Sequence, residues 1–303
     1  MSDKLFTYDD SEGRFIGSLT WMRDLILPLT VTLQITRRCN LKCVYCSECT
    51  MMPDSSLSST KDIIDKLDGI ERLIISGGEP TLSSDFATIL EYCHERFPTI
   101  ALATNATRID DTSLTAIKRY VDYVDVTLDG PRLVHDAVRG GYDRTRIGLQ
   151  RLVFEAKVPV SIVMVVMRQN ARFVEDIVSV ADFLGARKVK LLSPIAKGRG
   201  TAVLHDALTD DEIRDLHSRL GEAKVDRGWK CRISVTLWSQ IGMGHALLVH
   251  PDGKVVASPV WSDSSGVQVV GNLQTQDMSE IWRQYEFKSN HLRKYLGTSM
   301  LTV

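Results

Sequence analysis

The 303-residue sequence lacks an excess of charge of either sign. Its 37 Lys and Arg residues stand against 38 Asp and Glu residues, which gives a formal net charge of −1. No run of five basic residues occurs. A protein whose main partner is a nucleic acid usually carries a basic excess that neutralises phosphates. We therefore expect no nucleic-acid partner.

Long hydrophobic runs are also missing. The most apolar early stretch, Leu25 to Ile35, is interrupted by Pro28 and Gln34 and is too short to cross a bilayer. The opening residues, MSDKLFTYDD, show no basic segment followed by the apolar segment that marks a secretory signal. These absences predict a cytoplasmic protein without a membrane partner.

Cysteine is scarce but unevenly placed. The chain has six cysteines, which are Cys39, Cys43, Cys46, Cys49, Cys93 and Cys231. Four of them fall within one short segment. Because thiols stay reduced in the cytosol, such clustering indicates a metal site or catalysis rather than disulfide bonds.

Short apolar segments alternate with helix-like segments between about residues 30 and 200. The segments that predict strands are Thr32–Thr36, Arg72–Ser76, Ile100–Thr104, Tyr123–Leu128, Val158–Val166 and Lys188–Ser193. Nearly continuous runs of Val, Ile and Leu are typical of a parallel sheet covered by helices. Six such units in series predict an α/β fold, a partial (βα)6 TIM-like barrel, since a closed barrel needs eight.

The pattern changes after residue 208. A helix over 209–224, a hairpin over 245–260 and a final helix over 277–285 predict a small α+β extension. The predicted division is therefore an N-terminal extension over 1–28, a barrel over 29–208 and a C-terminal extension over 209–303.

The first predicted strand leads directly into the cysteine cluster, with the spacing Cys39-x3-Cys43-x2-Cys46. Active sites of α/β folds gather at the carboxyl ends of strands. Three thiolates in one loop can hold three irons of a [4Fe–4S] cluster and leave the fourth iron open. The alternative is a structural zinc site with Cys49 as the fourth ligand.

The loop CNLKCVYC resembles the cluster-binding loop of radical S-adenosylmethionine (SAM) enzymes. Further segments similar to that family's motifs follow the later strands in order: Gly77-Gly78-Glu79-Pro80, Thr104-Asn105, Thr127-Leu128-Asp129-Gly130, His135-Asp136, Arg139-Gly140 and Gly198-Arg199-Gly200. The last four are similar to the subgroup with SPASM or twitch extensions. A zinc site would not account for these additional motifs.

The resemblance implies a role for each matching residue. The cluster ligands would be Cys39, Cys43 and Cys46. The SAM site would comprise Tyr45 beside the adenine, the backbone of Gly77 and Gly78, Glu79 near the amino group, and Asn105 and Thr127 near the ribose and carboxylate. The arginines that could also hold the SAM carboxylate are Arg139, Arg144 and Arg146. The resemblance implies reductive cleavage of SAM to a 5′-deoxyadenosyl radical, which abstracts hydrogen from a substrate.

Some residues admit a simpler interpretation. We expect His135 and Asp136 to brace their loop rather than transfer protons, and Cys93 to pack within a helix. Cys231 is most simply a buried core thiol. Its alternative role is that of a hydrogen-atom donor to a substrate radical, as in the family's redox-neutral epimerases.

The segment over residues 244–282 resembles the SPASM/twitch region, which carries auxiliary-cluster cysteines before its PDGK turn and near Ser258. Neither place has a cysteine here. The sequence therefore predicts one [4Fe–4S] cluster, with the extension covering the barrel mouth.

The sequence leaves the substrate open. We expect a small polar molecule, such as a sugar, aminocyclitol or nucleoside in natural-product biosynthesis, because residues 1–28 are too short for a leader-peptide-binding domain. The alternative is a peptide maturase or epimerase, which the motif likeness favours. A non-catalytic metal-binding protein is the alternative from another class. A flavodoxin- or ferredoxin-type partner would supply electrons.

Overall fold

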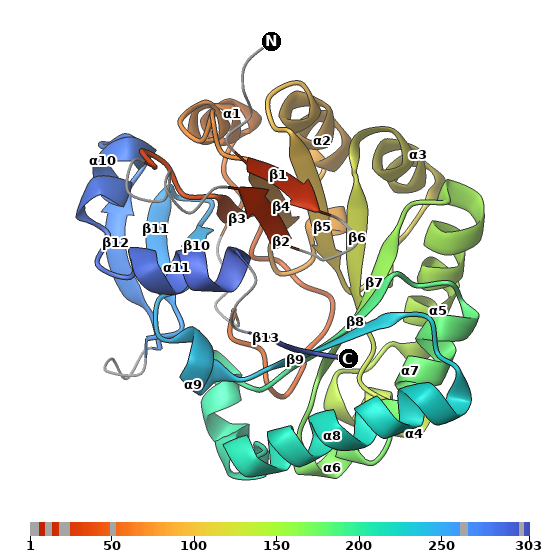
Figure 1. Cartoon of the computed structure of the whole chain (residues 1–303). Coiled ribbons are helices and arrows are strands. Elements are labelled where there is room, and N and C mark those ends of the chain that lie inside the picture. Colours follow the sequence, from red (N-terminus) through yellow and green to blue (C-terminus); the bar gives the residue numbers. More distant parts are fainter. Residues whose placement is uncertain (1–5, 10–13, 18–24, 49–52, 261–265, 297–299) are drawn as a thin grey trace.

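The computed structural model describes residues 6–9, 14–17, 25–48, 53–260, 266–296 and 300–303. An eleven-stranded sheet in the order β12-β11-β10-β3-β4-β5-β6-β7-β8-β9-β13 curves around a central space, with helices outside it (Figure 1). Neighbouring strands from β3 to β9 pair in parallel. This confirms the predicted α/β fold with a partial TIM-like barrel.

The six predicted strands are all present. They are β3 (Thr30–Gln34), β4 (Arg72–Ser76), β5 (Thr99–Thr104), β6 (Tyr123–Thr127), β7 (Val160–Val165) and β8 (Lys188–Leu192). The first ends two residues earlier than predicted, so Ile35 and Thr36 belong to the loop before the cysteines. Long apolar stretches locate these strands well because both faces of a parallel sheet are covered.

Residues beyond 208 extend the same sheet at both edges. At one edge, β9 (Arg232–Thr236) joins β8 in parallel, and β13 (Met300–Thr302) follows in antiparallel. At the other edge, β10 (Ala246–Val249) pairs in parallel with β3, and the predicted hairpin continues through β11 (Lys254–Ser258) to β12 (Gln268–Asn272). Hydrogen bonding is thus continuous across residue 208, and the domain boundary there stays a prediction.

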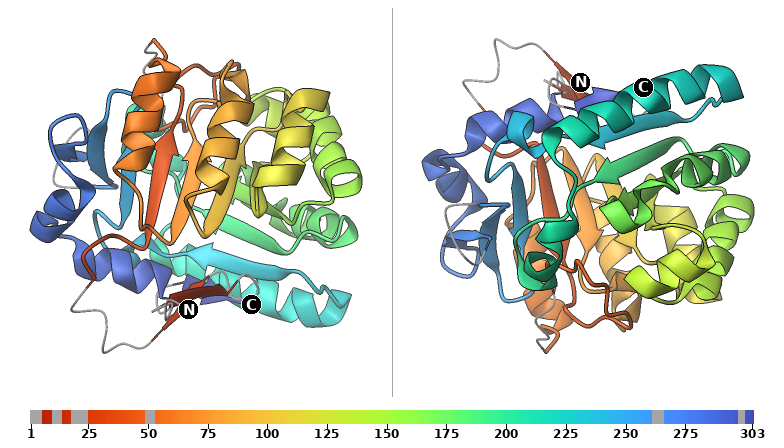
Figure 2. Two further views of the ribbon diagram at one scale, coloured as in Figure 1. Left: turned by 90° about the horizontal axis from the view of Figure 1, so that it is seen from above. Right: turned by 90° about the horizontal axis from the view of Figure 1, so that it is seen from below.

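The helices of the barrel pack outside the sheet, as the views from above and below show (Figure 2). They are α1 (Leu57–Asp65), α2 (Phe86–His94), α3 (Asp111–Tyr120), α4 (Arg132–Val138), α5 (Tyr142–Gln150), α6 (Arg168–Ala171) and α7 (Val174–Phe183). The later helices are α8 (Asp210–Arg227), α9 (Trp238–Ile241), α10 (Met278–Gln284) and α11 (Lys288–Tyr295). The expectation that the helix at 277–285 is the last was wrong, because α11 follows it. None of the helices in the described parts is long and apolar enough to span a membrane.

Alternate strand residues face opposite sides of the sheet. Leu73 and Ile75 of β4 point to the helices and belong to the main apolar core. Arg72 and Ile74 of the same strand line a cavity inside the barrel. The inner face is therefore not filled by the branched apolar layers usual in closed TIM barrels.

The amino-terminal end of the barrel is covered by β1 (Phe6–Asp9), β2 (Arg14–Gly17) and α11 (Figure 1). Tyr8 stacks on Tyr123, the first residue of β6, with ring centroids 5.9 Å apart. Phe15 and Tyr295 pack in a second apolar cluster nearby. Access to the barrel interior is therefore from the carboxyl end, where the predicted site residues lie.

Candidate active site

The loops after successive strands surround a cavity of about 420 Å³ at the carboxyl end of the barrel. The predicted residues that line it are Cys39, Cys43, Cys46, Tyr45, Gly77, Gly78, Asn105, Thr127 and Arg139. Glu79 and Cys231 do not line it. The structure thus brings together most of the residues that the motifs singled out, from four separate loops.

Backbone hydrogen bonds hold the cysteine loop from two sides. Val44 N donates to Val138 O at 2.9 Å, from the end of α4. Arg199, in the glycine-flanked segment after β8, donates from Nε to Cys43 O at 2.8 Å and from its backbone N to Cys46 O at 2.9 Å. The Gly198-Arg199-Gly200 motif therefore shapes the cysteine loop.

Three thiols of one short loop can each bind a different iron of a cluster. Among the described residues, no three His, Cys, Asp or Glu side chains come together closely enough to hold one metal ion. A mononuclear zinc site needs all its ligands about 2–2.3 Å from one point, whereas an iron–sulfur cluster binds each thiolate on a different iron. Cys49, the fourth ligand of the zinc alternative, lies outside the described residues.

The Cys43 thiol is buried, and the Cys39 and Cys46 thiols are half-buried. Burial raises the pKa of the Cys43 thiol to about 11, and burial also raises the pKa values of the Cys39 and Cys46 thiols. These raised pKa values favour the protonated thiols. A bound metal would favour the thiolates instead, because a coordinating thiol is deprotonated. The residues fit a cluster that three thiolates hold within this cavity.

Gly77 and Gly78 allow two loops to touch. A Cβ on Gly77 would lie 2.4 Å from Thr36 O, and one on Gly78 would lie 2.2 Å from Arg38 O. Gly78 N donates to Thr36 O and Glu79 N donates to Arg38 O, both at 2.8 Å. The resemblance led us to expect a close backbone approach to SAM. The structure shows a close approach to the backbone of the cysteine loop.

Glu79 is fully buried, and both its carboxylate oxygens accept hydrogen bonds within the protein. Oε1 accepts from Thr81 N at 3.2 Å, from Thr81 Oγ1 at 2.8 Å and from Thr104 Oγ1 at 2.6 Å, while Oε2 accepts from Asn105 N at 2.7 Å. Burial raises its pKa despite these bonds. Glu79 joins the loops after β4 and β5 and does not reach the cavity surface.

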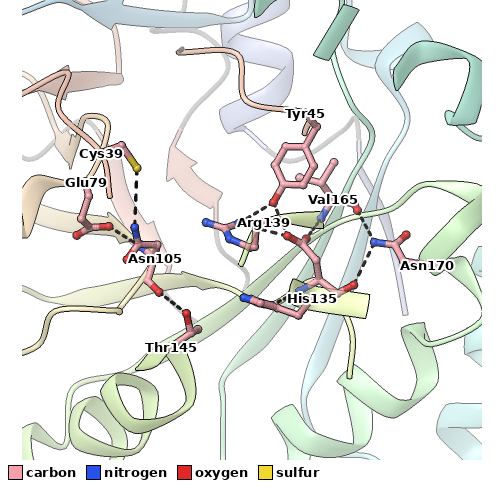
Figure 3. Close-up of polar contacts among 10 residues, drawn as sticks. Cys39, Tyr45, Glu79, Asn105, His135, Arg139, Thr145, Val165 and Asn170 are labelled. Carbon is pink, nitrogen blue, oxygen red and sulfur yellow. Dashed lines mark hydrogen bonds and ion pairs between the residues drawn. The ribbon is translucent and has the colours of Figure 1, made fainter. Parts of the chain in front are cut away.

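Asn105 connects the loop after β5 with the cysteine loop. Its Nδ2 lies 4.0 Å from Cys39 Sγ (Figure 3). The same Nδ2 donates to Asn40 Oδ1 at 3.0 Å, and Oδ1 accepts from Thr107 N at 2.8 Å. Thr127 ends β6 and lines the cavity beside Val163 of β7. Both residues line the same cavity as the three cysteines.

A buried network of hydrogen bonds and charges joins Tyr45 of the cysteine loop to Arg139 (Figure 3). Arg139 Nη1 donates to Tyr45 OH at 2.6 Å and lies 3.3 Å from Asp129 Oδ2. The Tyr45 hydroxyl donates to the same Asp129 oxygen. Burial, and next the Asp129 charge, raises the pKa of Tyr45, so this phenol stays protonated.

Asp129 belongs to one of the sequence motifs, but the resemblance to radical SAM enzymes gave this residue no role. Its Oδ1 accepts from Val165 N at 2.9 Å, so the side chain links the loop after β6 to the end of β7. His135 Nδ1 accepts from Asp129 N at 3.2 Å, and burial lowers the pKa of His135 to about 4. His135 braces the loop, in the way we expected.

The three candidate arginines are not equivalent in the structure. Arg139 lines the cavity, whereas Arg146 is exposed and donates to Gln150 of its own helix. Arg144 is not among the cavity residues. Arg139 is therefore the candidate best placed to meet a ligand.

Cys231 lies at the amino-terminal end of β9. It is buried in the apolar core, and its backbone N donates to Asp182 Oδ1 at 2.8 Å. The donor role of Cys231 stays a prediction that the cavity geometry does not support. Cys93 is buried in α2.

Side chains from beyond residue 208 complete the cavity wall. They are Trp238, His245, Ala246, Leu248, Ser258, Pro259 and Lys294. The sequence motifs gave these side chains no individual role. The hairpin reaches the barrel through the pairing of β10 with β3, and α11 packs against the barrel from near the end of the chain.

Comparison with known proteins identifies the family. Residues 33–184 match the model of the Radical SAM superfamily. The mycofactocin maturase MftC of Mycolicibacterium smegmatis is 34% identical over 217 residues, which cover 68% of this chain and 54% of MftC. The sporulation killing factor maturation protein SkfB of Bacillus subtilis is 27% identical over 224 residues, covering 71% of this chain and 54% of SkfB. The chain spans about half the length of these curated relatives.

The fold likeness extends further along the chain. A crystal structure of SuiB from Streptococcus suis bound to precursor peptide SuiA superposes with a TM-score of 0.74 at 15% identity, covering 90% of this chain and 69% of SuiB. The family model covers half of the chain and includes all three cysteines of the loop. The chain belongs to the radical SAM superfamily, in the SPASM- and twitch-related subgroup, and is an enzyme whose cofactors are a [4Fe–4S] cluster and SAM.

Proposed function

We propose that this radical SAM enzyme modifies a peptide. The observation that carries the proposal is the pair of relatives named as a maturase and as a maturation protein. They favour the peptide alternative over the small polar substrate that we expected first. The solved relative bound to a precursor peptide has the same fold.

We propose that Cys39, Cys43 and Cys46 hold the cluster. The bound cluster and SAM supply a 5′-deoxyadenosyl radical, which takes a hydrogen atom from the substrate. Protein groups would bind and orient SAM from the cavity wall: the backbone of Gly77, the side chains of Asn105 and Thr127, and the edge of Tyr45. Their support is their common position around one cavity.

Two further residues would support the site, Glu79 from behind the cavity wall and Arg139 from within it. Glu79 would fix the loops that carry Gly78 and Asn105, because its oxygens accept hydrogen bonds from those loops. Arg139 would place positive charge near an anionic end of a ligand while it stays held by Asp129. Apolar side chains such as Val165, Leu192 and Ile195 would exclude water from the reacting centre.

We also propose a cytoplasmic location and a flavodoxin- or ferredoxin-type electron donor. The clustering of cysteines in one loop supports a reducing compartment, because such clustering indicates metal binding rather than disulfide bonds.

The test uses anaerobically reconstituted protein, SAM, dithionite and a precursor peptide encoded beside its gene, with deuterium at candidate positions. We expect a mass change in the peptide and deuterium in 5′-deoxyadenosine. Deuterium transfer from a sugar or nucleoside, with no change in any peptide, would contradict the proposal and restore the small polar substrate.

A further inference from the structure

A second cavity, of about 280 Å³, lies deeper in the barrel, and we name it the inner chamber. Six residues line both cavities: Ala103, Thr127, Val163, Leu192, Trp238 and Lys294. At the other end, Tyr8 and Tyr295 line the chamber beneath the first residues of the strands. The chamber is thus the continuation of the cavity that begins at the cysteine loop.

The inner chamber is strongly cationic. Its charged lining residues are Arg72, Arg187, Lys188, Lys190, Lys294 and Asp125. Asp125 is already paired, because its two oxygens lie 2.8 and 2.6 Å from Lys190 Nζ. Arg72, Arg187, Lys188 and Lys294 add positive charge to the same small space, where Asp125 is the one carboxylate among the described lining residues. Arg187 makes further interactions of its own, so the charges that need explanation are those of Lys188 and Lys294.

Aromatic groups surround only some of this charge. Arg72 donates to Tyr123 OH at 3.1 Å, and its guanidinium lies 4.5 Å from the ring centroid of Tyr8. Lys188 and Lys294 have no ion-pair partner within the described part of the chain. Both are crowded by like charges, and burial followed by those charges lowers the pKa of each to about 7.

Buried cations oppose folding unless a counter-charge joins them. The barrel interior could hold Leu or Ile at such positions, as other barrels do. Two lysines on different elements, β8 and α11, instead point their charge into the same chamber. An anion that enters the inner chamber during function would explain why both lysines are present.

We infer that the inner chamber binds a carboxylate of the substrate, between Lys188 and Lys294. The inference rests on the proposed peptide substrate, whose carboxylates are its anionic groups. The chamber is smaller than the pockets that enclose drug-sized ligands, so it accommodates one residue of a peptide. The carboxylate is either the C-terminal group or an Asp or Glu side chain of that residue.

This arrangement gives the enzyme a way to choose the reacting position. A residue anchored by its carboxylate in the chamber has its Cα and Cβ directed toward Thr127 and Leu192, which line both cavities. Charge-assisted hydrogen bonds to lysine are stronger than neutral ones. Anchoring would therefore hold one hydrogen near the SAM site and leave the other residues of the peptide outside.

The test measures binding of three probes to the reconstituted, SAM-loaded protein by calorimetry. N-acetyl-tyrosine offers an α-carboxylate, the α-amide of N-acetyl-glutamic acid offers a side-chain carboxylate, and N-acetyl-tyrosinamide offers none. We expect at least one carboxylate probe to bind roughly tenfold or more tightly than the tyrosinamide. The better of the two carboxylate probes identifies the source of the carboxylate.

Variants locate the binding. Lys188→Met and Lys294→Met should each weaken the better carboxylate probe by roughly tenfold or more and leave the tyrosinamide unchanged. Lys118→Met, at an exposed position of α3, is the matched control and should change nothing. The comparison of carboxylate with amide on the unaltered protein holds even if a variant fails to fold.

Equal affinity for carboxylate and amide probes, absence of binding at millimolar concentrations, or full binding by both folded lysine variants would overturn the inference. A different result would reject the proposed function. Carboxylate binding that depends on the two lysines, without modification of any precursor peptide, would leave the chamber assignment intact and reject the peptide substrate.

Discussion

Gly77 and Gly78 show how the absence of a side chain positions the candidate site. The loop after β4 can hydrogen-bond to the cysteine loop only because no methyl group stands between the two backbones. The sequence pointed to a close approach at these glycines, since only glycine permits it. It could not show which group approaches, because that depends on how β3 and β4 are paired.

Gly78→Ala should therefore disturb the cysteine loop. The added Cβ would meet the Arg38 carbonyl at 2.2 Å, and overpacking of this kind typically costs about 1–3 kcal/mol or more. We expect a lower midpoint of denaturant unfolding and less bound iron after reconstitution. Gly221→Ala is the control. Gly221 lies within α8, and a Cβ there would meet only the Val303 side chain, at 3.8 Å. Normal iron content in Gly78→Ala would contradict this account.

Lys188 is a second case in which one side chain changes the stability of the fold by a measurable amount, here by lowering it. It is 4% exposed, and burial, then the charges of Lys190, Arg232 and Arg187, lowers its pKa to about 7, with Asp125 acting in the opposite direction. An unfolded lysine has a pKa near 10.4. Below pH 7 the lysine is charged in both states, so the cost of burying it is present in full; it is lost as the pH rises toward about 10.

Lys188→Met should accordingly be more stable than the unaltered protein at pH 6. The difference is at most on the order of 5 kcal/mol, from about 1.4 kcal/mol per pKa unit, and should shrink steadily up to pH 9. Thermal unfolding at several pH values measures it. A variant that is less stable at pH 6, or equally stabilised at every pH, would show that Lys188 is not an unpaired buried cation.

At the scale of elements, the strands of the barrel were the easiest part to predict. Their outward positions are apolar without interruption, as in Leu73 and Ile75 of β4, because helices cover that face. The edge elements were harder. The segment RISVT of β9 alternates in character, as a strand half-facing a polar cavity should, but it is short and follows a long polar helix.

The loop after β6 depends on Asp129 in a way that the motif did not reveal. Asp129 accepts from Val165 N and pairs with Arg139, so it joins the loop to β7 and to the end of α4. Residues as far apart in sequence as Tyr45, Asp129 and Val165 meet at this one fully buried carboxylate. Only the folded structure brings these partners together.

Asp129→Ala should leave Arg139 buried without its carboxylate, a change that costs about 3–5 kcal/mol. Asp111→Ala is the control, because its side chain is 93% exposed in its pair with Arg151, and exposed pairs contribute about 0–1 kcal/mol. Urea unfolding of both variants compares the two losses. Equal, small losses would mean that the network does not hold the loop.

At the scale of the whole molecule, the sequence located the reaction chemistry but not the substrate chamber. The cysteines and the loops after β4, β5 and β6 carry motifs that depend on cofactor chemistry. The chamber residues, such as Lys188 and Lys190, lie at alternate positions of a strand that otherwise appears apolar. Their common position becomes evident only when the strands from β4 to β9, together with β1 and α11, enclose the chamber.

The number of clusters is also a property of the whole chain. The missing cysteines before the PDGK turn and near Ser258 predict about four irons in each reconstituted chain. Iron and sulfide analysis, with absorption spectra before and after Cys231→Ala, measures this. Eight or more irons, or loss of iron in Cys231→Ala, would indicate an auxiliary cluster and revise the role of the extension.

The central claim is that three thiolates of one loop hold a cluster that acts on SAM. Its most direct test is formation of 5′-deoxyadenosine by anaerobic, dithionite-reduced protein, followed by chromatography. The account predicts product from the unaltered enzyme and from Cys93→Ala, whose thiol is buried in α2, and none from Cys43→Ala. Product from Cys43→Ala, or none from the unaltered enzyme loaded with iron, would contradict it.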